Sequence, residues 1–260
     1  MLDASHYKAW QKLEGISLDE MSAVKLMNRI DTKYVVSSSL LEEILLRMSS
    51  DYYVQKINDN PISTYDTIYY DTPSCAMYIC HHNKKLIRQK VRTREYLSSN
   101  LAFLEIKRKT NKGRTKKKRI EIPVDELMDF KLNEKAVNFL NEKSDFKSFE
   151  VSPKVRTHFD RITLVNRRKT ERLTIDFNLI FENFVTGKKV ALPEMMIIEL
   201  KQDGLQYSEM KAILSDMRIT SNRISKYCIG TVLTDDKIKK NRFLPKVRLI
   251  EKITGRKFNL

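Results

Sequence analysis

The chain has 260 residues, 41% of them apolar, enough for one sizeable domain with its own core. Its 49 lysines and arginines against 33 acidic residues give a net charge of +16, which indicates an anionic partner: nucleic acid, anionic lipid or a phosphate-rich molecule. No apolar run is long enough to span a bilayer, and we expect no secretory signal. Cys75, Cys80 and Cys228 lack metal-binding spacing and predict reduced thiols in a cytoplasmic protein.

The first half of the chain predicts a short helical segment followed by strands. Residues 2–28 have helical spacing, and Ser17 with Glu20 resembles a capping box. Residues 29–37 are β-branched and aromatic and predict a strand, and 38–48 predict a capped amphipathic helix. Two further strands are expected over 51–58 and 63–72, before a loop or short helix at 74–84.

Three consecutive strands are then predicted over 85–96, 100–110 and 115–123, each with an apolar face and a charged face. Side chains alternate along a strand, so every second residue shares a face. The charged faces hold Arg88, Lys90, Arg92 and Arg94 in the first strand, Glu105, Lys107 and Lys109 in the second, and Lys117, Arg119 and Glu121 in the third. Four cations in line on one strand repel each other unless an anion lies against them.

The second half repeats the pattern. A helical stretch over 124–143 precedes strands over 154–168, 171–183 and 194–202, and helical candidates follow at 208–217 and 222–233. Residues 235–260 are a polar, basic tail that we expect to fray or dock loosely. We therefore predict an α+β domain over residues 1–234, with 1–28 as its N-terminal helical segment.

A charged strand face is ordinarily the wet side of an antiparallel sheet. Here the pattern recurs on about seven strands and mixes arginine with glutamate, while flanking helices need an apolar face to cover. We favour a closed antiparallel β-tunnel of about eight strands, with helices packed outside and charges inside. Phosphate oxygens suit such a lumen because arginine presents a planar fork to them and lysine a compact charge.

The carboxylates on the charged faces have two interpretations. They pair with neighbouring cations, which we prefer for Glu105, Glu121 and Asp176, or they hold Mg²⁺ or Mn²⁺ together with substrate phosphates. Glu199 is the leading metal ligand because it lies with Lys201 at the end of a strong apolar strand. Glu105 and Glu121 are the weaker metal candidates.

An ordered set of short motifs carries a family resemblance. The motifs are R-x-D-T-K-Y (Arg29 to Tyr34), Y-Y-D-T (Tyr69 to Thr72), V-R-T-R-E-Y (Val91 to Tyr96), L-E-I-K-R-K-T (Leu104 to Thr110), F-D-R (Phe159 to Arg161), R-L-T-I-D (Arg172 to Asp176), I-E-L-K (Ile198 to Lys201) and S-K-Y (Ser225 to Tyr227). From about Leu18 to Gly230 they resemble the VTC domain, the catalytic domain of the vacuolar transporter chaperone polyphosphate polymerase and its bacterial relatives. That family belongs to the triphosphate tunnel metalloenzymes, whose fold is a closed β-tunnel lined with lysine, arginine and glutamate.

The resemblance implies roles for individual residues. The phosphate-binding cations would be Lys33, Arg92, Arg94, Lys107, Arg161, Arg172 and Lys201, with Lys226 on a C-terminal helix near one tunnel mouth. Glu199 would bind the metal. Lys117 or Arg119 would add a phosphate contact, and Lys90, on the charged face of the strand over 85–96, is a further candidate for substrate binding. His81 would replace an arginine of eukaryotic members as a weaker or pH-dependent cation. The E-x-E-x-K strand of tunnel triphosphatases is absent, and Arg29-x-Asp31-x-Lys33 stands in its place, which favours polymerase-like chemistry.

Three functions remain open at this stage. The first is a polymerase that moves the γ-phosphoryl group of ATP onto polyphosphate, primed by pyrophosphate. The second is a triphosphatase or polyphosphatase of the same tunnel class, and the third is a non-catalytic polyphosphate- or nucleotide-binding module. We expect no specific nucleic acid, because Tyr65, Tyr69, Tyr70 and Phe159 do not alternate with the cations. The membrane-spanning segments of the eukaryotic enzyme are not found in this sequence, so any membrane association would come through a separate membrane protein.

Overall fold

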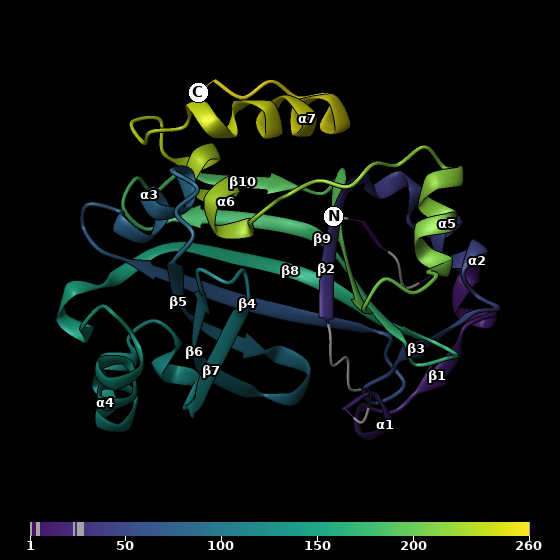
Figure 1. Ribbon diagram of the computed structural model, residues 1–260, viewed down its shortest axis with the longest axis horizontal. Helices are drawn as coiled ribbons and strands as arrows, with labels where there is room; N and C mark the ends of the chain where they lie inside the picture. Colours follow the sequence, from purple (N-terminus) through teal and green to yellow (C-terminus); the bar gives the residue numbers. More distant parts are fainter. Residues whose placement is uncertain (1, 4–5, 23, 25–28, 260) are drawn as a thin grey trace.

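A curled, eleven-stranded sheet forms the centre of the computed structural model, which describes residues 2–3, 6–22, 24 and 29–259 (Figure 1). Eight strands follow one another in the order β2-β11-β9-β8-β4-β5-β6-β7, and each neighbouring pair is antiparallel. The eight are β2 (Arg29–Ser37), β4 (Ile62–Asp71), β5 (Arg88–Tyr96), β6 (Leu101–Lys109), β7 (Thr115–Ile122), β8 (Ser152–Asn166), β9 (Glu171–Asn183) and β11 (Met195–Asp203). The short strands β1 (Glu14–Ile16), β3 (Tyr52–Gln55) and β10 (Lys189–Leu192) lie off this path. The predicted α+β class and antiparallel sheet are confirmed.

The predicted closure of the sheet is not confirmed. Among the described residues no pairing joins the outermost strands, β2 and β7. The free edge of β2 instead accepts a different segment of the chain, since the Asn222 backbone N–H donates to the Lys33 carbonyl at 2.6 Å and Tyr34 bridges to Ser221. The first residues of β7 are exposed and mostly basic, and lysine on an edge strand opposes further pairing. The sheet is therefore a curled trough with one protected edge and one charged edge.

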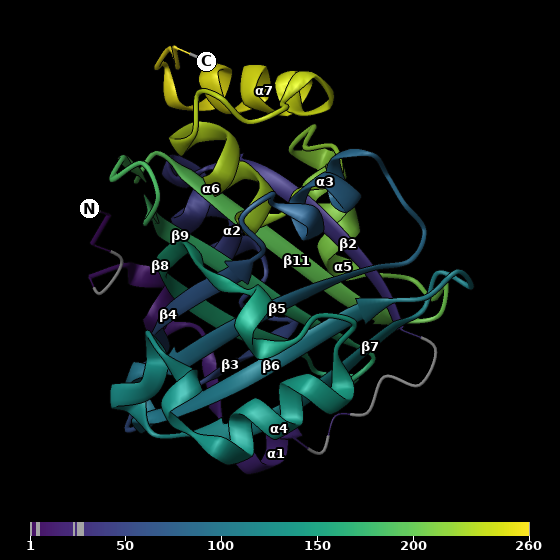
Figure 2. The same cartoon turned by 90° about the vertical axis from the view of Figure 1, so that its left-hand side faces the viewer.

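Helices cover the outer face of the sheet, which we define as the face that carries Ile68, Leu164 and Leu200. Over β2, β8, β9 and β11, this face packs against α2 (Leu41–Arg47) and α5 (Glu209–Asp216). Over β4 to β7, it packs against α4 (Glu134–Lys143), which lies across β6 and β7 in Figure 2. Burial of these apolar faces stabilises the fold at roughly 25 cal/mol per Å² removed from water. Helices packed outside the sheet are thus confirmed.

One end of the opposite, inner face is occupied by α6 (Lys226–Thr234). Every residue of α6 from Tyr227 onward is buried, because the helix lies between the sheet and both α3 (Ala76–His82) and α7 (Leu244–Thr254). Tyr227 donates a hydrogen bond to the Asp71 carboxylate at 2.5 Å, and that carboxylate also accepts the backbone N–H groups of Met77 and Tyr78. Asp71 thereby joins the end of β4 to the beginnings of α3 and α6.

Gly230 permits the close approach of α6 to the sheet, and replacing it should destabilise the protein. A Cβ atom at this position would lie 2.7 Å from Phe181 Cδ1 and 2.9 Å from Val155 Cγ1. We expect Gly230→Ala to lower the free energy of unfolding by about 1–3 kcal/mol in urea denaturation, as for other overpacked cores. Gly15→Ala is the matched control, because its Cβ meets only the flexible side chain of Lys56. Equal stability of the two variants would contradict the packing.

The N-terminal prediction was wrong in part. The described part of residues 2–28 forms a short 3₁₀ helix (Lys8–Gln11), β1 and the five-residue α1 (Leu18–Ser22), not one helical segment. Parallel pairing of β1 with β3 outweighs the helical spacing of apolar residues. The capping box is confirmed, since the Ser17 N–H donates to the Glu20 carboxylate at 3.0 Å and Ser17 Oγ accepts from the Glu20 N–H. Residues 23 and 25–28 lie outside the described residues.

The C-terminal expectation was also wrong, because the tail docks firmly. Phe243, Val247 and Ile250 are buried against α6 and the sheet, at the spacing of one helical face. The basic, polar composition of residues 235–260 as a whole conceals this apolar stripe in the sequence. No helix in the described part of the chain is long and apolar enough to cross a membrane.

A β-bulge sets which residues of β9 reach the inner face. The pairing of β8 with β9 shifts between His158 and Asp160, opposite Asn178, which has a φ of 52°. In a regular strand, side chains an odd number of residues apart point to opposite faces. Asp176 is three residues from the inward Leu179, so without the extra residue it would point outward. The bulge therefore turns Asp176 inward, together with Thr174 and Arg172.

Candidate functional site

The charged residues predicted on alternate strand positions form rows across the inner face, because residues opposite one another in register share a face. One row is Lys117, Lys107 and Lys90, on β7, β6 and β5. The next row is Arg119, Glu105, Arg92 and Tyr69, and it extends to β4. On the other half of the sheet the rows are Lys33, Glu199 and Thr174, and Asp31, Lys201 and Arg172.

The curl of the sheet brings the two halves together over this inner face. Lys33 on β2 lies close enough to contribute to lowering the pKa of both Lys90 and Lys107 on β5 and β6. Lys107 and Glu199 likewise influence each other's pKa, although their strands are not neighbours. The segment before α6 spans the same gap, because Lys90 Nζ donates to Ser225 Oγ at 2.7 Å. The predicted convergence of cations therefore occurs without closure of the sheet.

Glu105 organises two of the cations. Its buried carboxylate accepts from Arg92 Nε at 2.7 Å and also pairs with Lys117. Burial alone would raise the pKa of Glu105, but the charges of Arg92, Arg94 and Lys117 hold it well below its usual value. Glu105 is thus ionised and fully engaged, which supports the pairing interpretation and leaves it poorly suited to bind a metal.

Asp176 pairs with two other cations of the inner face, Arg161 and Lys226. Its carboxylate receives two parallel bonds from Arg161, at 2.5 Å to Nε and 2.8 Å to Nη2, and also pairs with Lys226 at the start of α6. Arg161 in turn stacks over Tyr65 at 4.8 Å, and Lys226 lies 4.1 Å above the Phe159 ring. Despite burial, Arg161 and Lys226 hold the pKa of Asp176 far below its usual value. Lys226 lies on a helix, as expected, but beside the cations of the inner face, since no pairing among the described residues closes a tunnel.

Two further cations of the inner face, Arg94 and Lys107, have no carboxylate in ion-pair contact among the described residues. Arg94 is buried, donates to Thr67 Oγ1 at 3.0 Å and lies over the rings of Tyr65 and Phe159. Burial and the neighbouring Arg92 lower its pKa. Lys107 is open to water, yet the surrounding protein and the nearby cations lower its pKa to about 8 against the influence of Glu199. Such cations are poised to gain an anionic partner.

Tyr69 is a functional candidate that sequence reasoning did not assign. Its buried phenol accepts from Arg92 Nη1 at 3.3 Å, and its ring stacks on Tyr227 at 5.1 Å. Burial raises the pKa of Tyr69, but Arg92, Lys90, Arg94 and Lys226 outweigh it and lower the pKa to about 7. Tyr69 lies opposite Arg92 in register, as Thr67 lies opposite Arg94. The alternation of residues along β4, compared with that of the basic strand β5, could therefore have identified it.

Anion affinity should therefore fall as the pH rises through 7 to 9. Above pH 7 Tyr69 gains a negative charge, and above pH 8 Lys107 and Lys201, whose pKa is also lowered to about 8 by burial, lose their positive charges. Isothermal titration with pyrophosphate should show weaker binding at pH 9 than at pH 6.5. Tyr69→Phe should flatten the part of the curve near pH 7, and an unchanged curve would contradict this role.

Glu199 best fits a divalent cation. Lys33 Nζ lies 3.3 Å from its carboxylate, and Lys33, Lys201 and Lys107 keep its pKa well below the usual value despite burial. The described residues contain no cluster of three or more His, Cys, Asp or Glu side chains able to hold a metal by themselves. A single carboxylate completed by phosphate oxygens is an arrangement that Mg²⁺ and Mn²⁺ accept.

The remaining predicted residues lie at the margins of the inner face. Arg119 is exposed and stacks 4.4 Å over Phe103, and Glu121 is exposed on the edge strand β7. His81 lies on α3, where burial and the cations Lys90 and Arg88 lower its pKa so far that it is uncharged at neutral pH. At neutral pH His81 can therefore offer an anion a hydrogen bond, where we expected a weaker or pH-dependent cation.

The aromatic residues differ from the prediction. Tyr65, Tyr69 and Phe159 lie on the inner face among the cations, and only Tyr70 lies on the outer face. Tyr65 and Phe159 stack on each other at 5.3 Å and are covered by Arg94 and Arg161. They are buried and already paired, so they are unsuited to stack on nucleic-acid bases.

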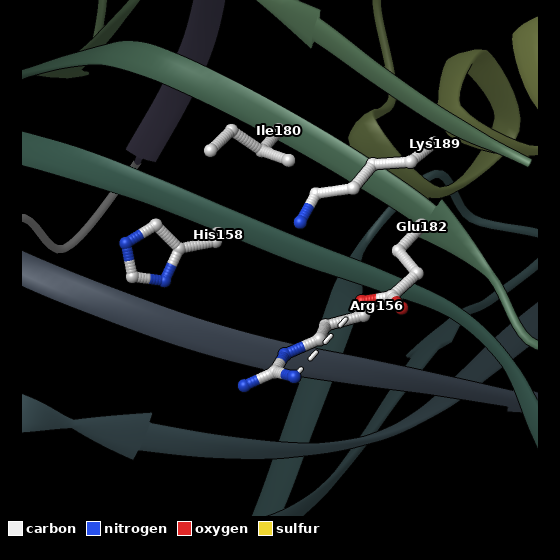
Figure 3. Close-up of a pocket in the computed structure, with 5 residues that line it drawn as sticks. All are labelled: Arg156, His158, Ile180, Glu182 and Lys189. Atoms are coloured by element: carbon white, nitrogen blue, oxygen red, sulfur yellow. Dashed lines mark ion pairs between the residues drawn. The ribbon is translucent and has the colours of Figure 1, made fainter. Parts of the chain in front are cut away.

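A cavity of about 240 Å³ lies outside this site, between β8, β9 and β10 (Figure 3). Arg156, His158, Ile180, Glu182 and Lys189 line it. Arg156 is held there by Asp66 on β4 and lies 4.0 Å from Glu182. These side chains are on the outer face, and none belongs to the rows of inner-face cations.

Comparisons with known proteins identify the family. A candidate adenylate cyclase from Bacillus halodurans is 13% identical with a TM-score of 0.49, over 76% of this chain and 96% of that one. A Hippeastrum protein with a dominant triphosphatase activity is also 13% identical, with a TM-score of 0.44 over 78% and 95%. These values are too low to transfer an activity, and no curated protein matches the chain. The model of the VTC domain matches residues 28–234, so the chain belongs to the VTC domain family.

Proposed function

We propose that this chain is a polyphosphate polymerase, which transfers the γ-phosphoryl group of ATP to the end of an inorganic polyphosphate chain. The observation that carries the proposal is the excess of cations over carboxylates on the inner face. Lys90, Arg94 and Lys107 have lowered pKa values there and no carboxylate in ion-pair contact among the described residues. Membership in the VTC domain family supports the same activity.

The chemistry requires positioning and charge more than acid–base catalysis. A terminal phosphate oxygen of the polymer is already ionised, so it attacks the γ-phosphorus without a general base, and the bond from that phosphorus to the β-phosphate oxygen breaks to release ADP. Arg92 and Arg161 are held by Glu105 and Asp176, so their guanidinium groups are oriented before substrate binds. Unpaired cations such as Lys107 would stabilise the charge that develops on the transferred group.

A divalent cation would be held by Glu199 together with the substrate phosphates. When bound there, Mn²⁺ or Mg²⁺ would supply positive charge that offsets the negative charge of the phosphates. Lys33, which pairs with Glu199 at 3.3 Å, would then be available to contact phosphate. A polyphosphate chain lying in the trough would face cations from β2 to β7.

The test uses purified protein with ATP labelled at the γ-phosphate, Mn²⁺ and a pyrophosphate primer. The proposal predicts labelled polyphosphate of increasing length, and Glu199→Gln should reduce its synthesis about a hundredfold. Glu182→Gln, on the outer face, is the matched control and should retain activity. Release of labelled phosphate alone would establish a hydrolase instead. Intact ATP, with bound polyphosphate displaced by ATP but not by duplex DNA, would establish a non-catalytic module.

A further inference from the structure

A basic and aliphatic surface lies beside the site, at the start of β5 and the turn between β6 and β7. Residues 84–88 and 108–118 carry ten lysines and arginines and no aspartate or glutamate. Arg88 pairs with Lys109 in register, so the loop that leads into β5 lies next to the turn, as Figure 2 shows. We call the exposed cationic and aliphatic residues of this region, apart from the inward Lys117, the loop patch: Lys84, Lys85, Leu86, Ile87, Lys112, Arg114, Lys116 and Lys118.

Two adjacent aliphatic side chains project from the loop patch. Leu86 is 65% exposed and Ile87 is 51% exposed. Ile87 lines a groove of about 430 Å³ with Lys116 and Lys118, which point outward from β7. The turn itself is well defined, because the Thr110 N–H donates to the Arg114 carbonyl at 2.9 Å and Gly113 adopts a φ of 75°.

We infer that the loop patch docks this protein on the surface of an anionic lipid bilayer. Exposed aliphatic side chains surrounded by cations match the surface of an anionic bilayer, where negative headgroups lie directly above the apolar acyl chains. A nucleic acid would meet the cations but not the aliphatic pair, and the loop patch has no aromatic ring for base stacking. Lysine on an edge strand discourages sheet pairing, yet that role does not require Leu86 and Ile87.

The surface is separate from the phosphate site. The loop-patch cations on β7, Lys116 and Lys118, alternate with the inward Lys117, so they point away from the inner face. Arg108 is excluded from the loop patch because it pairs with Asp145 at 2.9 Å. Docking would hold the adjacent end of the cationic trough, where Arg88 and Lys109 lie, close to the membrane.

The test is sedimentation of the full chain with vesicles of phosphatidylcholine, with or without phosphatidylglycerol. We expect binding only to the anionic vesicles. Leu86→Ser with Ile87→Ser should weaken it at least about tenfold at unchanged charge, and Lys116→Ser with Lys118→Ser should do the same. Polyphosphate synthesis and the thermal unfolding midpoint should be unchanged in both, because all four side chains are exposed.

Matched controls decide the outcome. Leu132→Ser with Phe149→Ser removes two other exposed apolar residues, and Lys8→Ser with Lys12→Ser removes two other exposed lysines. Both control pairs should bind like the wild type. Equal binding to neutral vesicles, or equal loss in a control pair, would overturn the inference. Dependence on the lysines without dependence on Leu86 and Ile87 would also overturn it, in favour of a soluble polyanion or an acidic protein.

Discussion

Lys107→Ala is expected to lower kcat/KM for polyphosphate synthesis about a hundredfold while leaving thermal stability unchanged or slightly higher. Removing one preorganised charge from a phosphoryl-transfer site typically costs about two to three orders of magnitude in rate. Lys107 has no carboxylate in ion-pair contact among the described residues, and it faces a cluster of like charges. Removing the Lys107 ammonium group therefore breaks no ion pair with a carboxylate of the described residues, and it reduces the repulsion among the neighbouring cations. Steady-state kinetics and a thermal melt of the same preparation measure both effects.

Lys118→Ala is the matched control for Lys107→Ala. Lys118 lies beside Ile106 on the next strand, so it projects to the outer face although it is close in space and identical in chemistry. Synthesis should be unaffected by its loss. Similar kinetic effects of the two substitutions would show that general surface charge, not the inner face, governs activity.

Asp176→Asn should produce the largest loss of stability, about 3–5 kcal/mol in urea denaturation. The substitution keeps the shape of the side chain but leaves Arg161 and Lys226 without their shared carboxylate in a buried place. Pyrophosphate should raise the unfolding midpoint of Asp176→Asn more than that of the wild type, because an anion replaces the missing charge. The exposed pair of Arg108 with Asp145 supplies the control, and Asp145→Asn should cost less than about 1 kcal/mol.

The pH dependence of this effect has a definite sign. The pKa of Asp176 is lowered in the folded protein, so its ion pairs stabilise the fold above the unfolded-state pKa of about 3.9. That contribution is lost as the pH falls below this value toward the folded-state pKa. The stability difference between wild type and Asp176→Asn should thus be full at pH 6 and shrink below pH 4. A constant difference across this range would contradict the assignment.

Strand alternation predicted the chemistry of the inner face well. Arg92, Lys107 and Lys117 were placed on one face by period two alone, and the register confirms their alignment across β5, β6 and β7. Polar strand residues are informative here because a one-residue shift would have moved every charge into the apolar core beneath α4. The order of the short motifs along the chain predicted the VTC domain family, and the match of the family model over residues 28–234 confirms it.

Features that depend on tertiary contacts could not be predicted. The bulge at Asn178 changes which residues of β9 face inward, and the register that places it depends on pairing with the strand β8. The bond from Asn222 to Lys33 covers the edge of β2, so the sheet ends there instead of closing. The surroundings of His81 likewise include a residue distant in the sequence, Lys107, whose charge helps to lower the pKa of His81.

The most direct measurement of the central claim is a crystal structure of the protein with a non-hydrolysable ATP analogue and Mn²⁺. The account predicts the phosphates on the inner face, in contact with Arg92, Lys107 and Arg161, and the metal beside Glu199. Phosphates bound on the outer face, such as in the cavity lined by Arg156 and Lys189, with the inner-face cations untouched, would contradict it.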